Sequence, residues 1–334
     1  MKSYELHPHA GFASLVAVER PEPPLGPSEV RVRVRAVSLN YRDLLIAKGA
    51  QTREAPVVPA SDGAGEVVEV GRDVRTLKVG DRVAAAFFPD WIDGAFQARF
   101  HQRALGGSAD GMLAEQVVLG EQAWVRIPAH LSFQEAATLP CAGVTAHHAL
   151  FAIDPIGPAS TIVVQGTGGV STFALQLARA AGARVIVTTS SEAKASAAKA
   201  RGAWATLDYR ANPQWGAAVV ELTHGCGADL VVEVGGPETL GQTIEGLRTG
   251  GTAALIGVLT GFSGAVSTAT VLHKLLRLQG VYVGSVRMFE SLVRLLELHE
   301  IRPLVDREFG FDEVRAAYEH LASGAHQGKV VVRL

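Results

Sequence analysis

The chain has 334 residues, enough for two domains, and it is 48% hydrophobic and 19% charged, as expected of a globular protein with a large core. Its 31 Lys and Arg residues nearly balance 33 Asp and Glu residues, which leaves a net charge of −2. Because no basic tract stands out, we expect neither nucleic acid nor an anionic membrane as a partner. The two cysteines, Cys141 and Cys226, are too few for a disulfide framework or a four-cysteine zinc lobe.

Residues 1–15 do not combine a basic segment with a following apolar one, as a secretory signal would. No uninterrupted apolar run approaches the roughly 20 residues that a membrane-spanning helix needs. We therefore expect a soluble, cytoplasmic protein.

The N-terminal third of the chain is predicted to be rich in β-structure. Residues 30–37 alternate Val and Ala with Arg, which is the period of a half-buried strand. Residues 65–70 form a short strand that ends at Gly71, and a turn at residues 80–81 leads into another strand.

From residue 160 onward, apolar strands alternate with helices. The predicted elements are strand 161–164, helix 173–181, strand 184–188, helix 192–201, and strands 229–234 and 252–256. Continuous apolar strands separated by helices are typical of a parallel sheet covered on both faces, so this part is predicted to be α/β. After residue 272 we predict a strand at 279–284, a helix at 290–299 and a final pair of elements within 303–334. This tail is expected to pack with the N-terminal β-rich region.

A glycine-rich turn follows the strand that ends at Gln165 and precedes an amphipathic helix, the setting of a dinucleotide-binding fingerprint. Gly166 permits the tight turn, and Gly168 lets the backbone approach a pyrophosphate, which the N-terminus of the following helix attracts. Ser171 stands where the fingerprint has its third glycine. The predicted cofactor contacts here are Gly166, Thr167, Gly168, Gly169 and Val170. The alternative is a plain glycine turn in front of a core helix.

The end of the next strand predicts which nicotinamide cofactor binds. Where an acidic residue would hold the ribose of NAD, residues 188–191 all carry hydroxyl groups, which accept a 2′-phosphate that a carboxylate would repel. Lys194 lies in the first turn of the next helix, where a cation is disfavoured unless an anion is near; alternatively it is a surface lysine beside Glu192. Tyr209 and Arg210 would add a stacking face and a second cation, or have no role. The predicted contacts are Thr189, Ser190, Lys194, Tyr209 and Arg210, and the predicted cofactor is NADP(H).

These motifs and their order resemble the medium-chain dehydrogenase/reductase superfamily, and within it the zinc-free branch of quinone oxidoreductase-like enzymes. The segments that carry the resemblance are residues 40–43, 56–71, 80–83 and 139–146, the glycine turn, and Gly328 with Lys329. The resemblance implies an α/β protein with a GroES-like, β-rich catalytic domain at 1–128 and 273–334. It also implies a Rossmann domain, a doubly wound parallel sheet, at 129–272, with a substrate cleft between the domains. A homodimer through an edge strand from Gln279 to Ser285 is implied as well.

The resemblance also implies cofactor contacts outside the glycine turn. These are Asn40, Thr145, Gly257, Val258, Leu259 and Lys329.

Zinc alcohol dehydrogenases of this superfamily hold their catalytic metal with two Cys residues and a His-Glu pair. In this sequence the corresponding positions hold Asn40, Ser61 with Asp62, and Cys141. Asn and Ser are poor ligands for zinc, which prefers thiolate and imidazole, so we predict that no zinc is bound. Cys141 is then expected to be an ordinary buried thiol.

Without a metal, reduction of a simple ketone would leave a poorly stabilised alkoxide. Quinones and α,β-unsaturated carbonyls yield delocalised anions, so we predict an NADPH-dependent reductase that transfers a hydride to them. Asn40 is the first catalytic candidate, because its amide can donate to a carbonyl oxygen or to the nicotinamide ribose; alternatively it holds loop backbone. Tyr41 is a candidate proton donor or a packing residue. Asp43, the third candidate, is expected to organise Arg42 or nearby backbone more than to transfer protons.

Three aromatic residues are predicted to form an apolar wall for a flat substrate, Phe87, Phe88 and Trp91; alternatively they pack in the core. Two other functions remain open. One is an alcohol or aldehyde dehydrogenase, and the other is an NADPH-binding protein with little turnover, in a crystallin-like or regulatory role.

Overall fold

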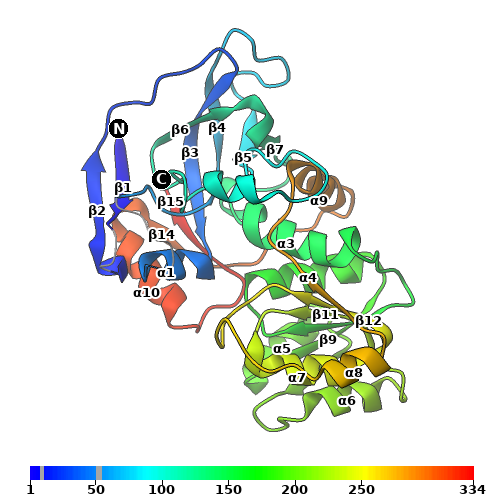
Figure 1. Ribbon diagram of the computed structural model, residues 1–334. Coiled ribbons are helices and arrows are strands. Elements are labelled where there is room, and N and C mark those ends of the chain that lie inside the picture. Colours follow the sequence, from blue (N-terminus) through cyan, green and yellow to red (C-terminus); the bar gives the residue numbers. More distant parts are fainter. Residues whose placement is uncertain (8–10, 50–54) are drawn as a thin grey trace. The chain divides into compact units, whose positions relative to one another are not determined.

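The computed structural model describes residues 1–7, 11–49 and 55–334. The chain forms two units, Met1–Val144 with Val283–Leu334, and Thr145–Tyr282, and Figure 1 shows the strands and helices of each. The predicted fold class, a β-rich part and a part with a parallel sheet, is confirmed. The divisions fall at residues 144/145 and 282/283, whereas the sequence predicted 128/129 and 272/273.

The first unit is built on a mixed sheet with strand order β14-β15-β3-β4-β5-β7, in which β6 also pairs with β3. Its strands are β3 (Glu29–Leu39), β4 (Asp62–Val70), β5 (Arg82–Ala85), β6 (Gln116–Gly120), β7 (Trp124–Arg126), β14 (Val305–Gly310) and β15 (Lys329–Arg333). Because β15 runs antiparallel beside β3, the C-terminal tail completes the N-terminal sheet, as predicted (Figure 1). A separate antiparallel pair is formed by β1 (Lys2–Leu6) and β2 (Leu15–Glu19).

Strand β3 shows why the sequence pattern led to this sheet. Val30, Val32 and Val34 are buried, while the intervening arginines face the other side of the strand, as side chains with a period of two must. Arg31 donates from Nε to Glu69 on the adjacent β4 at 2.8 Å. The alternation thus buries the valines and leaves each guanidinium beside solvent or a carboxylate.

The helices of the first unit are α1 (Tyr41–Ala47), α2 (Phe133–Ala136), α9 (Val286–Leu298) and α10 (Val314–Ala322). Helix α9 begins four residues before the predicted start at residue 290, because Ser285 caps it by accepting from the backbone N–H of Met288 at 3.2 Å. Helix α2 packs on β3 and β4, which places residues 129–144 with the first unit.

The second unit contains a parallel sheet with strand order β10-β9-β8-β11-β12-β13. Its strands are β8 (Thr161–Gln165), β9 (Arg184–Thr189), β10 (Ala205–Asp208), β11 (Ala228–Glu233), β12 (Leu247–Leu255) and β13 (Arg277–Gly280). The helices that follow the boundary are α3 (Val144–His147), α4 (Gly169–Ala180), α5 (Glu192–Ala200), α6 (Trp215–Leu222), α7 (Pro237–Gly246) and α8 (Thr268–His273). This is the order of a doubly wound sheet, and it reverses between β8 and β11. Ligands of such sheets bind outside the carboxyl ends of the strands at that reversal.

The last strand of this sheet corrects the prediction for the dimer segment. The sequence predicted a strand at 279–284 in the catalytic domain. The structure instead places β13 at Arg277–Gly280, parallel to β12, with Thr252 opposite Arg277. Residues 273–282 belong to the second unit, and β13 is the edge strand of its sheet. It shares only Gln279 and Gly280 with the predicted strand from Gln279 to Ser285, and the homodimer stays a prediction. Within the part of the chain that the structure describes, no helix is both long and apolar enough to cross a bilayer.

Candidate functional site

The glycine turn after β8 contains one glycine, Gly168, that neither the backbone conformation nor the packing of the protein requires. Gly166 has a φ of +71°, a conformation that favours glycine. Gly168 has a φ of −74°, which any residue adopts, and an added Cβ would meet no described atom within 4 Å. Because neither conformation nor packing explains Gly168, the space beside it fits a group from outside the chain.

Two kinds of hydrogen-bonding group at this turn have no partner among the described residues. The hydroxyl of Thr167 is buried, and no described residue hydrogen-bonds to it. Gly168 caps α4, whose first N–H groups are unpaired, as at any helix N-terminus, and carry a partial positive charge. These donors fit a dinucleotide pyrophosphate, with Gly169 and Val170 in the first turn of the helix.

Ser171 replaces the third glycine of the fingerprint and is 3% exposed. Its hydroxyl donates to the main-chain oxygen of Gln165 at 2.6 Å, and α4 packs on β8. A small residue therefore keeps the close approach of helix and strand, as predicted.

The residues predicted to read the 2′-phosphate follow two neighbouring strands. Thr189 ends β9 and lies opposite Asp208 at the end of β10. The backbone N–H of Tyr209 donates to Thr189 O at 3.1 Å, so Tyr209 and Arg210 start beside the end of β9. Lys194 lies in the first turn of α5, where its N–H donates to the capping hydroxyl of Ser191 at 3.4 Å. The segments that follow β9 and β10 therefore both begin at the carboxyl ends of these strands, and Ser190 lies between β9 and α5. Their contact with a cofactor stays a prediction.

Glu233, at the end of β11, is a buried carboxylate that the sequence analysis missed. It accepts from the N–H groups of Gly235 at 2.8 Å and Gly236 at 2.9 Å, and from Gln165 Nε2 at 2.6 Å. The hydroxyls of Thr239 and Thr243, on α7, also donate to it. Glu233 therefore ties the ends of β8 and β11 to the start of α7. The sequence did offer a sign of this role, because an acidic residue at the end of a strand is followed closely by two glycines whose N–H groups can reach it.

The loop after β12 lies against the loop after β11, which begins at Val234. Gly257 approaches Val234 so closely that an added Cβ would lie 1.9 Å from the Val234 oxygen. Val258 is half-buried and Leu259 is exposed. The hydroxyl of Thr260 donates to Gly235 O at 3.0 Å, so the two loops are joined at the carboxyl ends of adjacent strands. Thr145, in α3, is buried, and its role stays a prediction.

Asn40 and Asp43 cap α1 in the first unit. The backbone N–H of Asn40 donates to Asp43 Oδ2 at 2.7 Å, and that of Asp43 donates to Asn40 O at 2.9 Å. This confirms that Asp43 organises nearby backbone. Burial raises the pKa of Asp43 to about 6, although the adjacent Arg42 guanidinium lowers it. Tyr41, the first helical residue, is 38% exposed, and proton donation by it is untested.

Lys329 reaches the same point from the other end of the chain. Its Nζ donates to Leu39 O at 2.6 Å and to Asn40 Oδ1. The pairing of β15 with β3, which sets Val330 opposite Leu39, brings these residues together. Lys329 is only 3% exposed, and its predicted contact with the cofactor is untested.

Asp62, which is buried, and Cys141, which is half-buried and not fully buried as predicted, complete this cluster. Asp62 accepts from the Ser61 hydroxyl at 2.6 Å and from the Cys141 N–H at 3.1 Å. Burial raises the pKa of the Asp62 carboxyl, and the charge of Lys329 is the strongest of the influences that lower it. Burial, followed by the charge of Asp62, raises the pKa of the Cys141 thiol, so Cys141 is a protonated thiol rather than a thiolate.

The predicted substrate wall lies in a packed aromatic cluster. Phe87, Phe88 and Trp91 are each no more than 2% exposed. Phe87 and Phe88 meet edge to face at 4.6 Å between ring centroids, and the Arg42 guanidinium lies 4.5 Å from the centroid of Phe87. These residues therefore pack in the core, which was the alternative to the predicted substrate wall. Their contact with substrate is untested.

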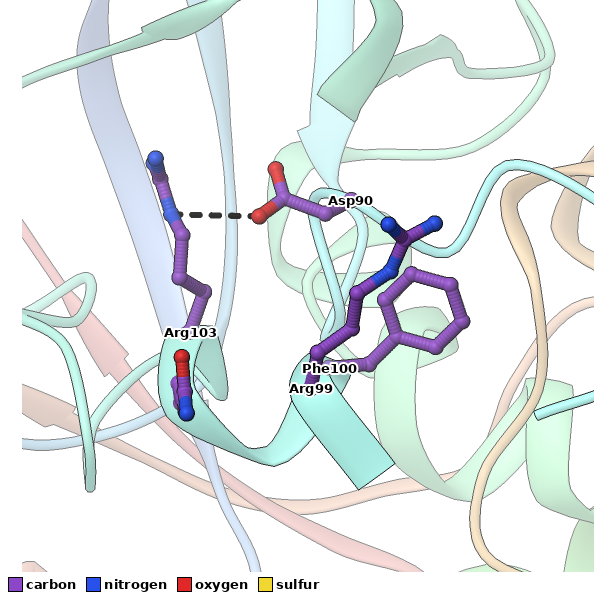
Figure 2. A pocket seen from close by; sticks show the side chains of 5 residues that line it. Asp90, Arg99, Phe100 and Arg103 are labelled. Carbon is purple, nitrogen blue, oxygen red and sulfur yellow. Dashed lines mark ion pairs between the residues drawn. The ribbon is translucent and has the colours of Figure 1, made fainter. Parts of the chain in front are cut away.

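A pocket of about 320 Å³ lies on the helical turn η2 (Ala98–Arg103), next along the chain from these aromatics. Figure 2 shows Arg103 paired with Asp90, 3.5 Å apart, and the Arg99 guanidinium beside the ring of Phe100. Gln102 is the fifth lining residue. Both cations thus have protein partners, and we assign no ligand to this pocket.

Two family models match the chain. One is described as the alcohol dehydrogenase GroES-like domain and covers residues 26–129, and the other, described as zinc-binding dehydrogenase, covers residues 169–298. A zinc-type alcohol dehydrogenase-like protein of Schizosaccharomyces pombe is 43% identical, over 97% of this chain and 96% of the relative. The chain is a medium-chain dehydrogenase/reductase.

Other relatives place this medium-chain dehydrogenase/reductase in the quinone oxidoreductase-like branch and show that it is an oxidoreductase. A quinone oxidoreductase of Pseudomonas aeruginosa is 32% identical, over 92% of this chain and 91% of the relative. A crystal structure of a Sinorhizobium meliloti protein, named as an alcohol dehydrogenase, superposes with a TM-score of 0.93 at 39% identity and covers 100% of this chain and 98% of that chain. The family predicted from the motifs is confirmed.

Two further solved structures of this superfamily concern the cofactor. A mycobacterial protein complexed with NADPH has a TM-score of 0.84, with 26% identity and full coverage of both chains. An NAD-dependent alcohol dehydrogenase has a TM-score of 0.90, with 31% identity and full coverage of both chains. One of these proteins is named with NADPH and the other with NAD, and both cofactors are nicotinamide dinucleotides. The open space at Gly168 and the donors beside it fit a cofactor of this kind.

The residues at the family's metal-ligand positions do not fit a zinc ion. Asn40 Oδ1 already accepts from an ammonium, and both oxygens of Asp62 are engaged by Ser61 and Cys141. Among residues 1–7, 11–49 and 55–334, no group of three or more His, Cys, Asp or Glu side chains is arranged to hold a metal. A dication beside the buried Lys329 ammonium would also be repelled.

Proposed function

We propose that this medium-chain dehydrogenase/reductase uses NADPH to reduce quinones or α,β-unsaturated carbonyls, without a catalytic metal. The observation that carries the proposal is the buried ammonium of Lys329. It is bonded to Asn40, and its charge acts on both Asp62 and Cys141. A cation of the protein therefore lies among the side chains that zinc-dependent relatives would use as ligands.

The substrate class follows from the donors in this cluster. An amide and an ammonium supply hydrogen bonds but not the strong polarisation of a metal ion, so acceptors that delocalise the new charge are favoured. Bound NADPH supplies the hydride. The hydride would add to a carbon of the conjugated system, and the π-electron pair displaced there would move onto the carbonyl oxygen. The Asn40 amide would donate a hydrogen bond to that oxygen, and a proton from solvent would complete the reduction. Tyr41, partly exposed beside it, is the candidate to pass that proton.

The cofactor contacts are proposed at the carboxyl ends of the parallel strands. The turn from Gly166 to Val170 would hold the pyrophosphate, and Thr189, Ser190 and Lys194 would hold the 2′-phosphate. Tyr209 and Arg210 would flank the adenine ribose, while Val258 and Leu259 would contact the nicotinamide. The preference for NADPH over NADH rests on the hydroxyl groups and the lysine at the end of β9, where no carboxylate stands before Glu192.

We also propose a homodimer through the exposed edge of β13. The backbone groups on the free side of an edge strand are open to pairing with another strand. Val281 N–H pairs with Leu255 O on β12, so the preceding residue, Gly280, turns its N–H to the free side of the strand. Gly280→Pro would remove that donor and is expected to halve the molar mass measured by light scattering. The matched control, Gly280→Ala, keeps the N–H and adds a Cβ that meets no described atom within 4 Å, so it should leave the mass of the assembled protein unchanged.

The proposed activity is tested by following NADPH oxidation anaerobically with quinones, enones, aldehydes and ketones, each with and without a chelator. We expect turnover of the conjugated acceptors that the chelator does not affect. Turnover of simple aldehydes alone would favour an alcohol or aldehyde dehydrogenase, the activity named for several relatives. Tight NADPH binding without turnover of any acceptor would favour a binding protein, and stoichiometric zinc in the purified protein would overturn the metal-free mechanism.

A further inference from the structure

Asp306 is an extra residue in the pairing of β14 with β15. Val305 lies opposite Lys329 and Arg307 lies opposite Val330, so the register passes over Asp306, as in a β-bulge. Bulges are frequent next to active sites, where they change the direction in which a side chain points. This irregularity lies directly beside the residue whose ammonium carries the proposed function.

The carboxylate of Asp306 joins three segments of the first unit. Its Oδ1 accepts from the backbone N–H of Gln327 at 2.9 Å, in the loop that leads into β15. Its Oδ2 lies 2.7 Å from Nε2 of His320, on α10. The side chains of Asp306 and His320 are 22% and 15% exposed, so the protein covers most of both. We call this pair, with the N–H of Gln327, the Asp306 latch.

The groups around Asp306 favour its ionised form. Partial burial raises the pKa of Asp306, but the Gln327 N–H and the bond and charge of His320 lower it, and the result is below the ordinary value. The charge of His326 acts in the same direction. An ionised carboxylate can only accept hydrogen bonds, so Nε2 of His320 must carry a hydrogen. A neutral imidazole makes this bond as well as a charged one, and the latch is therefore closed at neutral pH.

The latch holds the residues from which the Lys329 side chain extends. The N–H of Lys329 donates to Leu304 O at 2.9 Å, so residues 327 and 329 are both bonded to the start of β14 or to the residue before it. Between them, Gly328 has a φ of +77°, and an added Cβ would lie 2.3 Å from Leu304 O. Three successive residues are thus held against one segment.

The position of Lys329 matters because its ammonium is buried. Lys329 is 3% exposed, and its Nζ donates to Leu39 O at 2.6 Å and to Asn40 Oδ1. A buried ammonium is costly without such bonds, and hydrogen bonds tolerate little change in distance and angle. A shift at the start of β15 would therefore draw the ammonium away from both acceptors.

We propose that Asp306 and His320 are positioning residues, which hold the ammonium of Lys329 in place for the reduction. The inference rests on the proposed function, in which an amide and this ammonium take the place of a metal ion. Neither positioning residue has to contact substrate or cofactor, because both act through the loop that leads into β15. Groups fixed before the reaction stabilise developing charge without reorganising, and a displacement of about 1 Å can cost about 100-fold in rate.

A double-mutant cycle measures whether Asp306 acts through Lys329. Lys329→Met is expected to lower kcat on the order of 100-fold, as loss of a group that stabilises developing charge does. Asp306→Ala is expected to lower kcat on the order of 10-fold, with the KM for NADPH changed less than about twofold. The double variant should match Lys329→Met alone, because the latch then has nothing to position. Glu308→Ala, which removes an exposed carboxylate from the same strand, should behave as wild type.

Two further variants test the bonds of the latch. Asp306→Asn keeps an oxygen for the Gln327 N–H, so it should restore most of the kcat that Asp306→Ala loses. His320→Phe keeps a ring beside Phe309 but removes the bond to Asp306. It should lower kcat less than Asp306→Ala does, and adding it to Asp306→Ala should cause no further loss.

The hold on the chain has a readout that needs no activity. Amide hydrogen exchange measured by NMR reports the N–H groups of Gln327 and Lys329 separately. Asp306→Ala is expected to speed exchange at both on the order of 10-fold or more, whereas Asp306→Asn and Glu308→Ala should keep the wild-type rates. The amide of Ala254, on β12 of the second unit, should not change, because general destabilisation of the protein is not the cause.

These measurements separate the inference from the function on which it rests. If the wild type reduces no acceptor, the proposed function is refuted, and the exchange rates still decide whether the latch holds Lys329. Multiplicative losses in the cycle, or a Gln327 N–H that exchanges equally fast with and without Asp306, would overturn the inference, as would a loss confined to the KM for NADPH. If Lys329→Met does not fold, Asp306→Asn must still restore both kcat and slow exchange for the inference to hold.

Discussion

The hydroxyl of Ser171 donates to the main-chain oxygen of Gln165 at 2.6 Å and thereby bonds the first turn of α4 to the end of β8. Glycine at this position would let the helix pack closely on the strand because it has no side chain, but it would make no side-chain hydrogen bond. Here the serine adds a hydrogen bond between the helix and the strand. The departure from the fingerprint is therefore compatible with the close packing that the fingerprint requires.

Ser171→Ala is expected to destabilise the protein by about 1 kcal/mol, the typical net value of one hydrogen bond. Urea denaturation measures this as a lower midpoint with an unchanged slope. The matched control is Ser196→Ala on the exposed face of α5, where the hydroxyl makes a surface bond to Glu192. That control should change stability by less than about 0.5 kcal/mol. Equal midpoints for the two variants would contradict the role given to Ser171.

Gly168→Ala and Gly257→Ala are expected to have opposite effects. The first adds a methyl group where no described atom lies within 4 Å, whereas the second forces it to 1.9 Å from Val234 O. Gly168→Ala should therefore keep or slightly raise the thermal midpoint, since its φ suits alanine, and should weaken NADPH binding tenfold or more. Gly257→Ala should lower the midpoint. Fluorescence titration and thermal unfolding of both variants check this, and unchanged NADPH affinity in Gly168→Ala would rule out the proposed phosphate turn.

Glu233→Ala is expected to cost on the order of 3 kcal/mol or more, because it leaves several buried donors without an acceptor. Those donors are Gln165, Gly235, Gly236, Thr239 and Thr243. Unfolding in denaturant gives the loss, and Glu245→Ala, at the exposed surface of α7, serves as the control. NADPH affinity should fall in parallel, since the loop after β11 would no longer be held. A stable Glu233→Ala protein with normal affinity would disprove this.

Stability should depend on pH through Asp43. Burial raises its pKa to about 6 in the folded protein, against about 3.9 when unfolded. Between these values the folded state binds more protons, so the free energy of unfolding falls as pH rises from about 4 to about 6. The total contribution is about 3 kcal/mol, at 1.36 kcal/mol for each pKa unit. Asp62, with a pKa also raised by burial, acts in the same direction.

Asp43→Asn keeps an acceptor for the Asn40 N–H and removes the titration. We expect its free energy of unfolding to vary less between pH 4 and pH 6 than that of the wild type and to be higher at pH 7. Asp73→Asn, at an exposed position, should keep the wild-type slope. Parallel slopes for Asp43→Asn and wild type would mean that Asp43 titrates at its ordinary pKa.

Lys194→Glu should reverse the proposed cofactor preference. A carboxylate in the first turn of α5 repels the 2′-phosphate, so the KM for NADPH is expected to rise tenfold or more while that for NADH changes little. Lys199→Glu, in the last turn of the same helix, changes the net charge equally and should leave both values unchanged. Wild-type protein that used NADH as well as NADPH would already contradict the assignment of Thr189, Ser190 and Lys194.

The sequence by itself determined the parallel sheet, the glycine turn and the family, because these depend on local patterns. Apolar runs such as residues 161–164 must be buried on both faces, and a turn such as that at Gly166 needs a residue that accepts a positive φ. The same local reasoning misplaced the start of α9 and the strand near residue 279. Capping by Ser285 and pairing with β12 decided those limits.

Only the tertiary structure decided the chemistry of the first unit. Asn40, Asp62, Cys141 and Lys329 come from four separate segments, and nothing in their spacing shows that an ammonium lies among former metal-ligand positions. The pairing of β15 with β3 places it there, and burial then strengthens each interaction by removing water. In the same way, Glu233 becomes a support for the cofactor loops because folding surrounds it with donors from β8, α7 and the turn between β11 and α7.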